Sequence, residues 1–338
     1  AIAVLRASRD KAPAAVQPAV LEGLLQGAET LQTSGDAAAA AVVYRDLLNE
    51  QSPASVRAAA WRGVVLCEPA QRADLMIEAL RGKDRVVQQA AWKLIRELGD
   101  APVVRACARQ WDALPAESQR AVLDAHVTLG MEAIPTIRAA IASDNEAVRI
   151  AGLEAAGCAG EADLVGILAA WIAKGSDAER TAARQSLERL SADDVDKALL
   201  AAMGSAEPSV RVELIDALRR RGAAVATDHL MKQARSDAPQ VRRAALAALG
   251  EVAGPEQVPG LVGLLAEQAR GDQADDAVNA LVAVAKRTSM QERAAQLVLA
   301  RFSEATGPTR TALLNALGQL GSARGEAALR DALKQNDD

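Results

Sequence analysis

One short segment recurs along this chain at nearly constant intervals. It reads Val241-Arg242 in its clearest copy and is repeated at Val148-Arg149 and Val210-Arg211, each time followed by an aliphatic stretch. Taking the arginine position as an anchor, the copies fall at Arg57, Gln88, Gln119, Arg149, Arg180, Arg211, Arg242, Ala274 and Arg310. Successive anchors are 31, 31, 30, 31, 31, 31, 32 and 36 residues apart. A sustained period of this length indicates a repeat protein, in which each repeat contacts only its neighbours.

Each period has room for two helices. Apolar residues recur at positions −1, +3 or +4, +7 and +10 from the anchor, which is a helical stripe. A turn signal with an acid, serine or proline precedes many anchors, as at Asp84, Asp144, Asp237 and Pro208. Such residues favour a helix start. Glycines end the anchor helices at Gly99, Gly130, Gly160, Gly222 and Gly321. The other helix of a period is expected at 101–113, 131–142, 161–174, 223–235 and 258–269.

Composition agrees with closely stacked helices. Half of the residues are hydrophobic but only 2% are aromatic, so alanine, leucine and valine must fill the core. Alanine is the strongest helix former, and long alternating runs of β-branched residues, typical of strands, are absent. The sequence therefore predicts an all-α fold.

The repeat resembles the HEAT family, in the short form found in phycobilin lyase subunits and many prokaryotic scaffolds. The matching residues are best seen in Asp237, Val241-Arg242 and Leu249-Gly250. The resemblance covers residues 52–338 and implies a right-handed α-solenoid (an α–α superhelix) of about nine helix pairs. It also implies that the anchor helix is the second of each pair and lines the concave face. The anchor arginine would bond the turn acid and form a ladder, interrupted at Gln88, Gln119 and Ala274.

The first residues do not follow the period. Helices expected at 14–31 and 37–49 resemble a tetratricopeptide hairpin, which we interpret as a cap on the array. The predicted domains are thus an N-terminal hairpin at 1–51 and the repeat array at 52–338. At the other end, residues 323–335 form the first half of a further repeat. This half-repeat and the Ala start indicate either a terminal cap and a removed leader, or a piece of a larger protein.

Charge and rare residues argue against several functions. The net charge is −5, from 44 acidic and 39 basic residues, whereas nucleic-acid binders usually carry a basic excess. The two histidines, His126 and His229, form no metal-binding motif, and His126 occupies a core position. No apolar stretch approaches the ~20 residues of a membrane span. Three cysteines, expected to be small buried apolar residues, suggest no disulfide framework. We predict no cofactor, metal, nucleic acid or membrane partner.

A candidate partner-binding stripe follows from the helix register. Positions +1, +5 and +9 from the anchor lie beside it on the exposed face. Across the repeats they supply six basic and six acidic residues and no aromatic one, a poor platform for stacking nucleic-acid bases. The residues that we predict to contact a partner are Arg62, Lys93, Arg120, Asp124, Glu154, Asp216 and Arg243.

The tryptophans divide into two pairs. Trp61 and Trp92 share repeat position +4, which predicts neighbours inside the core. Trp111 and Trp171 lie in first helices, and an exposed aromatic there could anchor a partner.

The leading hypothesis is a non-enzymatic scaffold that holds a protein or peptide on an extended concave surface. The alternative is a spacer or interaction domain of a larger bacterial protein whose catalytic part lies elsewhere. A third interpretation is an enzyme of the HEAT-like DNA glycosylase or lyase kind. A cytoplasmic location fits the sequence, as does an exported one if a leader preceded Ala1, and the sequence predicts no oligomeric state.

Overall fold

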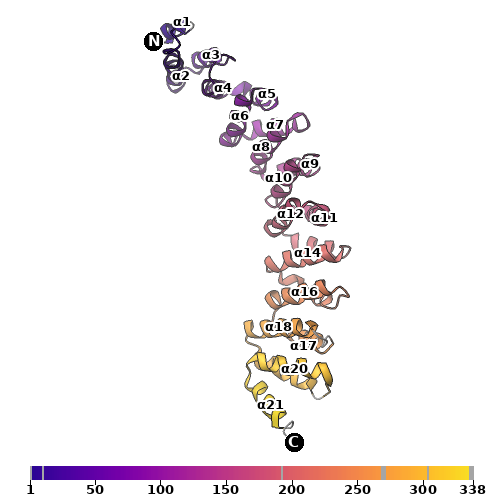
Figure 1. Ribbon diagram of the computed structural model, residues 1–338. Coiled ribbons are helices and arrows are strands. Elements are labelled where there is room, and N and C mark those ends of the chain that lie inside the picture. The colour runs from indigo at the N-terminus through magenta and orange to yellow at the C-terminus, as the bar shows by residue number, and fades with distance from the viewer. Residues whose placement is uncertain (1, 10, 192, 268–271, 303, 335–338) are drawn as a thin grey trace. The chain divides into compact units, whose positions relative to one another are not determined.

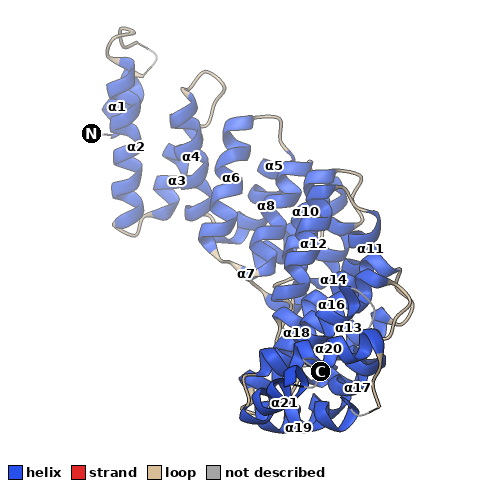
Figure 2. Cartoon of the chain, turned by 60° about the horizontal axis from the view of Figure 1, so that its bottom comes forward, coloured by secondary structure: helices blue, strands red, loops and turns tan. Residues whose placement is uncertain are grey.

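The computed structural model describes residues 2–9, 11–191, 193–267, 272–302 and 304–334. These residues form α-helices joined by short turns and single 3₁₀ turns, and none of them lies in a β-strand (Figure 2). The predicted all-α class is confirmed. The helices group into two compact units, residues 1–159 and 160–338.

Unit 1 contains ten α-helices in its described residues. They are α1 (Ile2–Ser8), α2 (Gln17–Thr33), α3 (Ala37–Leu47), α4 (Ala54–Cys67), α5 (Arg72–Arg81), α6 (Arg85–Leu98), α7 (Ala101–Ala108), α8 (Ala116–Val127), α9 (Ile134–Ile141) and α10 (Glu146–Ala156). Three 3₁₀ turns join them: η1 (Pro69–Gln71), η2 (Trp111–Ala113) and η3 (Gly130–Ala133).

Unit 2 contains eleven α-helices in its described residues. They are α11 (Leu164–Lys174), α12 (Asp177–Arg189), α13 (Val195–Met203), α14 (Pro208–Arg220), α15 (Thr227–Gln233), α16 (Pro239–Val252), α17 (Val258–Glu267), α18 (Asp272–Arg287), α19 (Gln291–Phe302), α20 (Gly307–Leu320) and α21 (Ala323–Lys334). Two 3₁₀ turns are η4 (Ala224–Ala226) and η5 (Pro255–Gln257).

Within each unit the helices stack in two rows. The nine anchor positions lie one in each of the even-numbered helices from α4 to α20. In unit 1 the anchor helices α4, α6, α8 and α10 each contact the next, and α5 contacts α7 in the other row. In unit 2 each anchor helix from α12 to α18 contacts the next anchor helix. In the other row, α11 contacts α13 and α17 contacts α19. Figure 1 shows these pairs following one another along the chain. The predicted helical-repeat solenoid is confirmed.

The helix ends show which sequence signals act. Asp84 accepts bonds from the backbone N–H groups of Val86 and Val87 at the start of α6, and Ser176 forms a capping box with Glu179. The five predicted glycine stops all have positive φ, as at Gly99 (+56°), a conformation that side chains disfavour. Asp144 and Asp237, which the sequence predicts as caps, do not cap their helices. The N-cap is the following residue in each case, Asn145 for α10 and Ala238 for α16.

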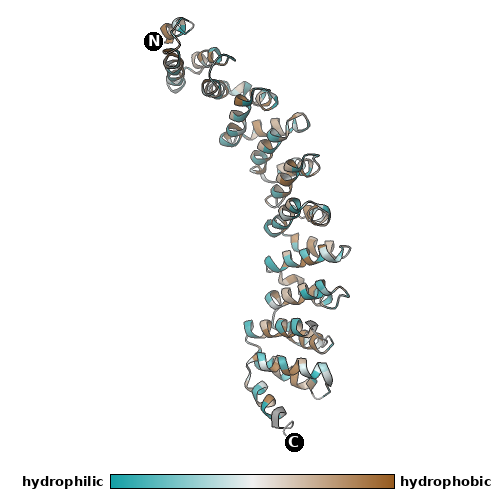
Figure 3. Ribbon diagram, viewed as in Figure 1, coloured by the Kyte–Doolittle hydropathy of each residue, from teal (hydrophilic) through white to brown (hydrophobic). Residues whose placement is uncertain are grey.

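Several first helices are shorter than expected because 3₁₀ turns take up part of the predicted range. The segment predicted as a helix at 101–113 is split into α7 and η2, and the helix predicted at 131–142 is split into η3 and α9. Similar turns precede α15 and α17. Most helices carry both hydrophobic and hydrophilic residues along their length (Figure 3), as expected for helices with one buried face.

Seven of the nine anchor side chains donate to a backbone carbonyl in the segment that precedes their own helix. Arg242 Nη1 donates to the carbonyl oxygens of Ser236 at 2.6 Å and Asp237 at 3.0 Å. The carbonyls at a helix end lack intrahelical donors, so the guanidinium satisfies the main chain there. The resemblance implies a bond from the anchor arginine to the carboxylate of the turn acid. Arg242 bonds the backbone carbonyls instead, so this prediction is wrong at Arg242. The carboxylate bond is present at Arg180, which pairs with Asp177.

The glutamine anchors preserve this interaction instead of breaking it. Gln88 Nε2 donates to the carbonyl oxygens of Leu80 at 3.2 Å and Gly82 at 3.3 Å. Gln119 Nε2 donates to the carbonyl of Trp111 at 3.0 Å. The predicted interruption is wrong at both positions, because an amide N–H serves the turn carbonyls as a guanidinium does. Ala274 is the anchor whose side chain has no donor.

Adjacent arginines in α16 allow a matched test of this role. Arg242→Ala removes a partly buried donor from two carbonyls, so it should lower the free energy of unfolding by about 1 kcal/mol. Arg243 is 65% exposed and pairs with Asp276, so Arg243→Ala should change it by no more than about 0.5 kcal/mol. Urea denaturation of both variants measures the difference. Equal midpoints would contradict the role given to the anchor.

The N-terminal hairpin packs directly on the first anchor helix. α2, α3 and one face of α4 enclose a cluster that includes Leu24, Tyr44 and Val64. Trp61 and Val65, on the adjacent face of α4, belong to the next cluster along unit 1. Helix α1, which the sequence pattern did not predict, lies against glycines of α2. The domain boundary between residues 51 and 52 stays a prediction.

Candidate functional site

The predicted partner-binding residues all lie on anchor helices, in two groups. Unit 1 holds five of them: Arg62 on α4, Lys93 on α6, Arg120 and Asp124 on α8, and Glu154 on α10. All five are exposed. The register that placed them on the solvent side of the anchor helices is therefore correct, while their role in binding stays a prediction.

In unit 2 the predicted residues are Asp216 on α14 and Arg243 on α16. Arg243 is exposed and Asp216 is half-buried. Asp216 lines a groove between α14 and α16, and Arg243 lines one between α16 and α18.

Several of these charges bind the neighbouring repeat. Arg62 pairs with Glu97 on the next anchor helix. Arg96 reaches Asp124 at 3.6 Å, and Arg243 Nε lies 3.2 Å from Asp276 Oδ2 on α18. The stripe is thus partly an inter-repeat network of ion pairs. Sequence spacing could not show this, because pairing depends on how adjacent helices are offset.

Lys93 and Arg120 differ from the other predicted residues. Both are exposed, and neither forms an ion pair within the residues that the structure describes. Their charges are available to a partner without breaking a contact inside the protein.

Asp216 is the centre of a charged network in unit 2. Its carboxylate accepts from Arg219 Nε at 2.9 Å and from Arg220 Nε at 2.9 Å. Arg219 continues to Glu251 on α16 at 2.7 Å, and Arg220 continues to Glu188 on α12 at 3.1 Å. Partial burial raises the pKa of Asp216, but the two guanidinium groups outweigh burial and hold the pKa below its usual value. The network therefore stays ionised and joins three anchor helices.

Two grooves flank α16 on this face. The first, about 380 Å³, lies between α14 and α16 and the second, about 320 Å³, lies between α16 and α18. Both are bordered by Ala247 and Glu251. The floors are formed by small or aliphatic side chains, namely Val212, Ala244, Leu246, Gly250, Ala280 and Ala283. The remaining lining residues are Glu213, Asp216, Arg219, Arg243, Asp276 and Asn279.

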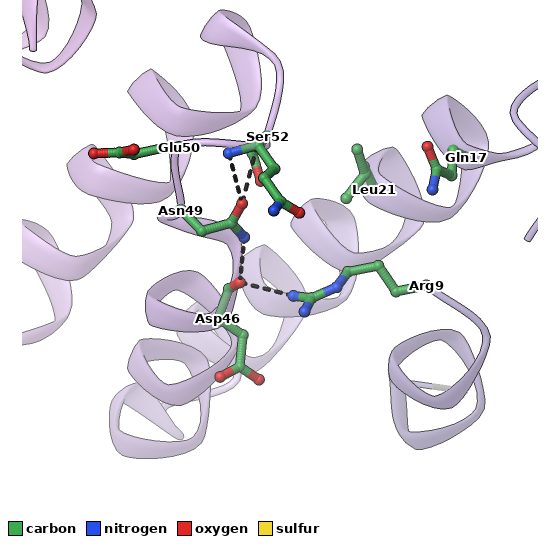
Figure 4. Close-up of a pocket in the computed structure, with 8 residues that line it drawn as sticks. Arg9, Gln17, Leu21, Asp46, Asn49, Glu50 and Ser52 are labelled. Carbon is green, nitrogen blue, oxygen red and sulfur yellow. Dashed lines mark hydrogen bonds between the residues drawn. The ribbon is translucent and has the colours of Figure 1, made fainter. Parts of the chain in front are cut away.

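A larger hollow of about 500 Å³ occurs beside the N-terminal hairpin, but several of its polar groups bond to one another. The carbonyl oxygen of Asp46 accepts from Arg9 Nη1 at 2.8 Å and from Asn49 Nδ2 at 3.1 Å (Figure 4). Asn49 Oδ1 in turn accepts from the backbone N–H of Ser52 at 3.0 Å. These bonds stabilise the turn between α3 and α4.

The tryptophan and cysteine predictions are partly correct. Trp61 is buried and Trp92 is half-buried, as core neighbours should be. Trp111, for which the sequence left an exposed position open, is buried in η2. Trp171 is half-buried, with Lys174 Nζ 4.7 Å from its ring centre. Cys67 and Cys107 are buried as expected, whereas Cys158 is exposed.

His126 lies in the core, as its repeat position predicts. It is 6% exposed, and its Nδ1 lies 2.9 Å from the hydroxyl of Thr136. Within the described residues, His, Cys, Asp and Glu side chains form no group of three or more that could hold a metal ion. Over the same residues, no helix has the length and apolar character to cross a bilayer.

Comparison with known proteins supports the repeat assignment. Residues 196–282 match the family model of HEAT repeats, which confirms the resemblance and includes all the residues that line the two grooves around α16 except Ala283. No curated protein sequence matches the chain.

Solved structures with a similar fold include Kap121p, at a TM-score of 0.55 and 14% identity over 97% of this chain and 44% of that one. Kap121p bound to Ste12p gives 0.57 and 14%, over 98% and 44%. Kap121p bound to Pho4p gives 0.55 and 14%, over 99% and 45%. The chain spans less than half the length of these proteins. At this identity the similarity shows a shared helical-solenoid fold.

Proposed function

We propose that this protein is a non-enzymatic scaffold that binds an extended segment of a partner protein across α14, α16 and α18. The observation that carries the proposal is the pair of grooves on the two sides of α16, which share Ala247 and Glu251. Two shallow grooves in series suit a polypeptide chain, whereas a compact ligand needs one enclosed pocket.

The side chains in the grooves indicate what kind of segment binds. The small floor residues let a backbone approach α16 closely. The rim carries four carboxylates and two guanidinium groups, from Glu213, Asp216, Glu251 and Asp276 against Arg219 and Arg243. Arg184 and Arg220, which lie outside the lining, pair with Glu213 and Asp216. Among the lining residues, carboxylates still outnumber guanidinium groups, which favours a segment with lysine or arginine side chains and disfavours a phosphate backbone. The protein complexes of Kap121p support the proposal, because they show that a similar solenoid binds proteins.

A random twelve-residue peptide library tests the proposal. Peptides selected on the intact protein should be rich in basic residues. Ala247→Trp, which fills both grooves, and Glu251→Lys, which reverses the shared charge, should each weaken selected peptides about tenfold or more. Asp228→Lys is the matched control, because it makes the same charge change on the exposed side of α15 in the other row. It should leave affinity within about twofold.

Two results would overturn the proposal. One is an equal loss of peptide affinity in Asp228→Lys and Glu251→Lys, which would show that the effect comes from the net charge of the protein alone. The other is tight binding of duplex DNA that persists from ~50 to 200 mM salt, since the acidic rim offers little counterion release.

A further inference from the structure

A second cleft lies in unit 1, where the N-terminal hairpin meets the first repeat. Its volume is about 340 Å³, and it is bordered by the end of α3, by α4 and α5, and by the start of α6. The apolar lining is formed by Leu48, Trp61, Leu75, Ala79 and Val87. The charged rim is formed by Arg45, Glu50, Arg57, Glu78, Lys83 and Asp84.

The cleft exists because the hairpin does not continue the repeat packing. Further along unit 1, α5 packs on α7 in the row of first helices. The preceding helix, α3, packs mainly on α2 and α4 instead. The place of a regular helix contact against α5 is thus left partly open, above the buried ring of Trp61.

Trp61 contributes a hydrogen-bond donor without an acceptor. The residue is 3% exposed, and among the described residues no acceptor pairs with its indole N–H. This N–H is also not sealed from solvent, since it is not among the buried polar atoms that lack a partner. Water can satisfy the donor where it reaches the N–H, so a ligand that displaces this water must supply an acceptor of its own.

The next repeat shows how the same position is normally satisfied. Trp92, one period after Trp61, donates from Nε1 to Ser118 Oγ at 2.9 Å. Ser118 Oγ then donates to the carbonyl of Leu80 at 2.7 Å. Ser118 directly precedes the anchor Gln119, and the residue that directly precedes the anchor Gln88 is Val87. Valine cannot accept a bond, so the first repeat lacks the acceptor.

We propose that this cleft binds a peptide segment of a partner protein, with one large apolar side chain on the floor. A backbone carbonyl of the same segment accepts from Trp61 Nε1–H. A peptide supplies an apolar group and an acceptor a few ångströms apart, which matches the two features of the cleft. The rim carries three basic and three acidic side chains, so it offers no excess of positive charge to a phosphate-rich ligand. The site is separate from the grooves around α16, so either proposal can fail alone.

The smallest probe with both features is N-acetyl-leucine methylamide. With about 13 heavy atoms, such a ligand should bind with a millimolar dissociation constant. Titration of ¹⁵N-labelled full-length protein should shift the indole N–H resonance of Trp61 and leave that of Trp92 in place. Single Trp→Phe variants assign the four indole signals. N-acetyl-glycine methylamide has the same carbonyls without the side chain, and it should bind at least fivefold more weakly.

Two matched variants isolate the hydrogen bond. Val87→Ser reproduces the Ser118 arrangement, so its hydroxyl should occupy the indole N–H and weaken the leucine probe about tenfold. Val87→Ala removes similar volume without adding an acceptor, so it should keep the affinity within about twofold. An unchanged Trp92 resonance verifies the fold of each variant. The proposal is overturned by an unmoved Trp61 signal, by equal loss in both variants, or by equal binding of the glycine probe.

Discussion

Gly152→Ala is expected to destabilise the protein by about 2 kcal/mol, although alanine is the better helix former. Gly152 lies buried in α10 against α9. A Cβ atom there would lie 2.7 Å from the backbone nitrogen of Ile141 and 2.8 Å from the Cβ of Ala140. Backbone cannot move aside as a flexible side chain can, so the overpacking cost should reach about 3 kcal/mol. The gain in helix propensity offsets about 1 kcal/mol of it.

Gly166→Ala is the matched control for this prediction. Gly166 lies in α11, and no atom outside its own helix backbone and chain neighbours lies within 4 Å of the position that its Cβ would take. The same substitution should therefore raise the free energy of unfolding by up to about 1 kcal/mol. Urea denaturation should move the two variants in opposite directions. A stabilised Gly152→Ala variant would show that α9 and α10 separate at little cost.

The sequence alone suggests the opposite result at Gly152. The position is +3 from the anchor, where other repeats have Ala60, Ala91, Ala183 and Ala245, all fully buried. Repeat spacing thus predicted which face of the helix is buried, because burial follows the 3.6-residue period. It could not predict the distance between α9 and α10, which depends on the packing of both helices together.

The same division holds for the candidate sites. The register of the stripe was predictable, and Asp216 and Arg243 do border grooves. The ion pair between Arg62 and Glu97 was not predictable, because it depends on the offset between neighbouring helices. For the cleft over Trp61 the sequence contains one indication, because Val87 occupies the repeat position that Ser118 occupies in the next repeat. This difference can be interpreted only once the hydrogen bond from Trp92 to Ser118 is known.

Acidification from pH 7 to pH 5 is expected to destabilise unit 1 through His126. Burial lowers the pKa of His126, as does the charge of Arg105, while Glu132 acts in the opposite direction. In the unfolded chain the imidazole takes up a proton near its ordinary pKa of about 6.5. The folded state takes up that proton only at lower pH. The stabilisation is therefore complete above about pH 6.5 and falls as the pH drops below it, by at most about 1.4 kcal/mol per pH unit.

Replacing the polar pair as a unit isolates this effect. His126→Leu alone leaves the 7% exposed Thr136 without its imidazole partner, which should cost about 1–3 kcal/mol at every pH. His126→Leu with Thr136→Val substitutes apolar groups for both and should restore much of that loss at pH 7. Because the titrating group is gone, unfolding free energies of the double variant should change less between pH 7 and pH 5. Parallel pH profiles for the wild type and the double variant would assign the acid sensitivity to other groups.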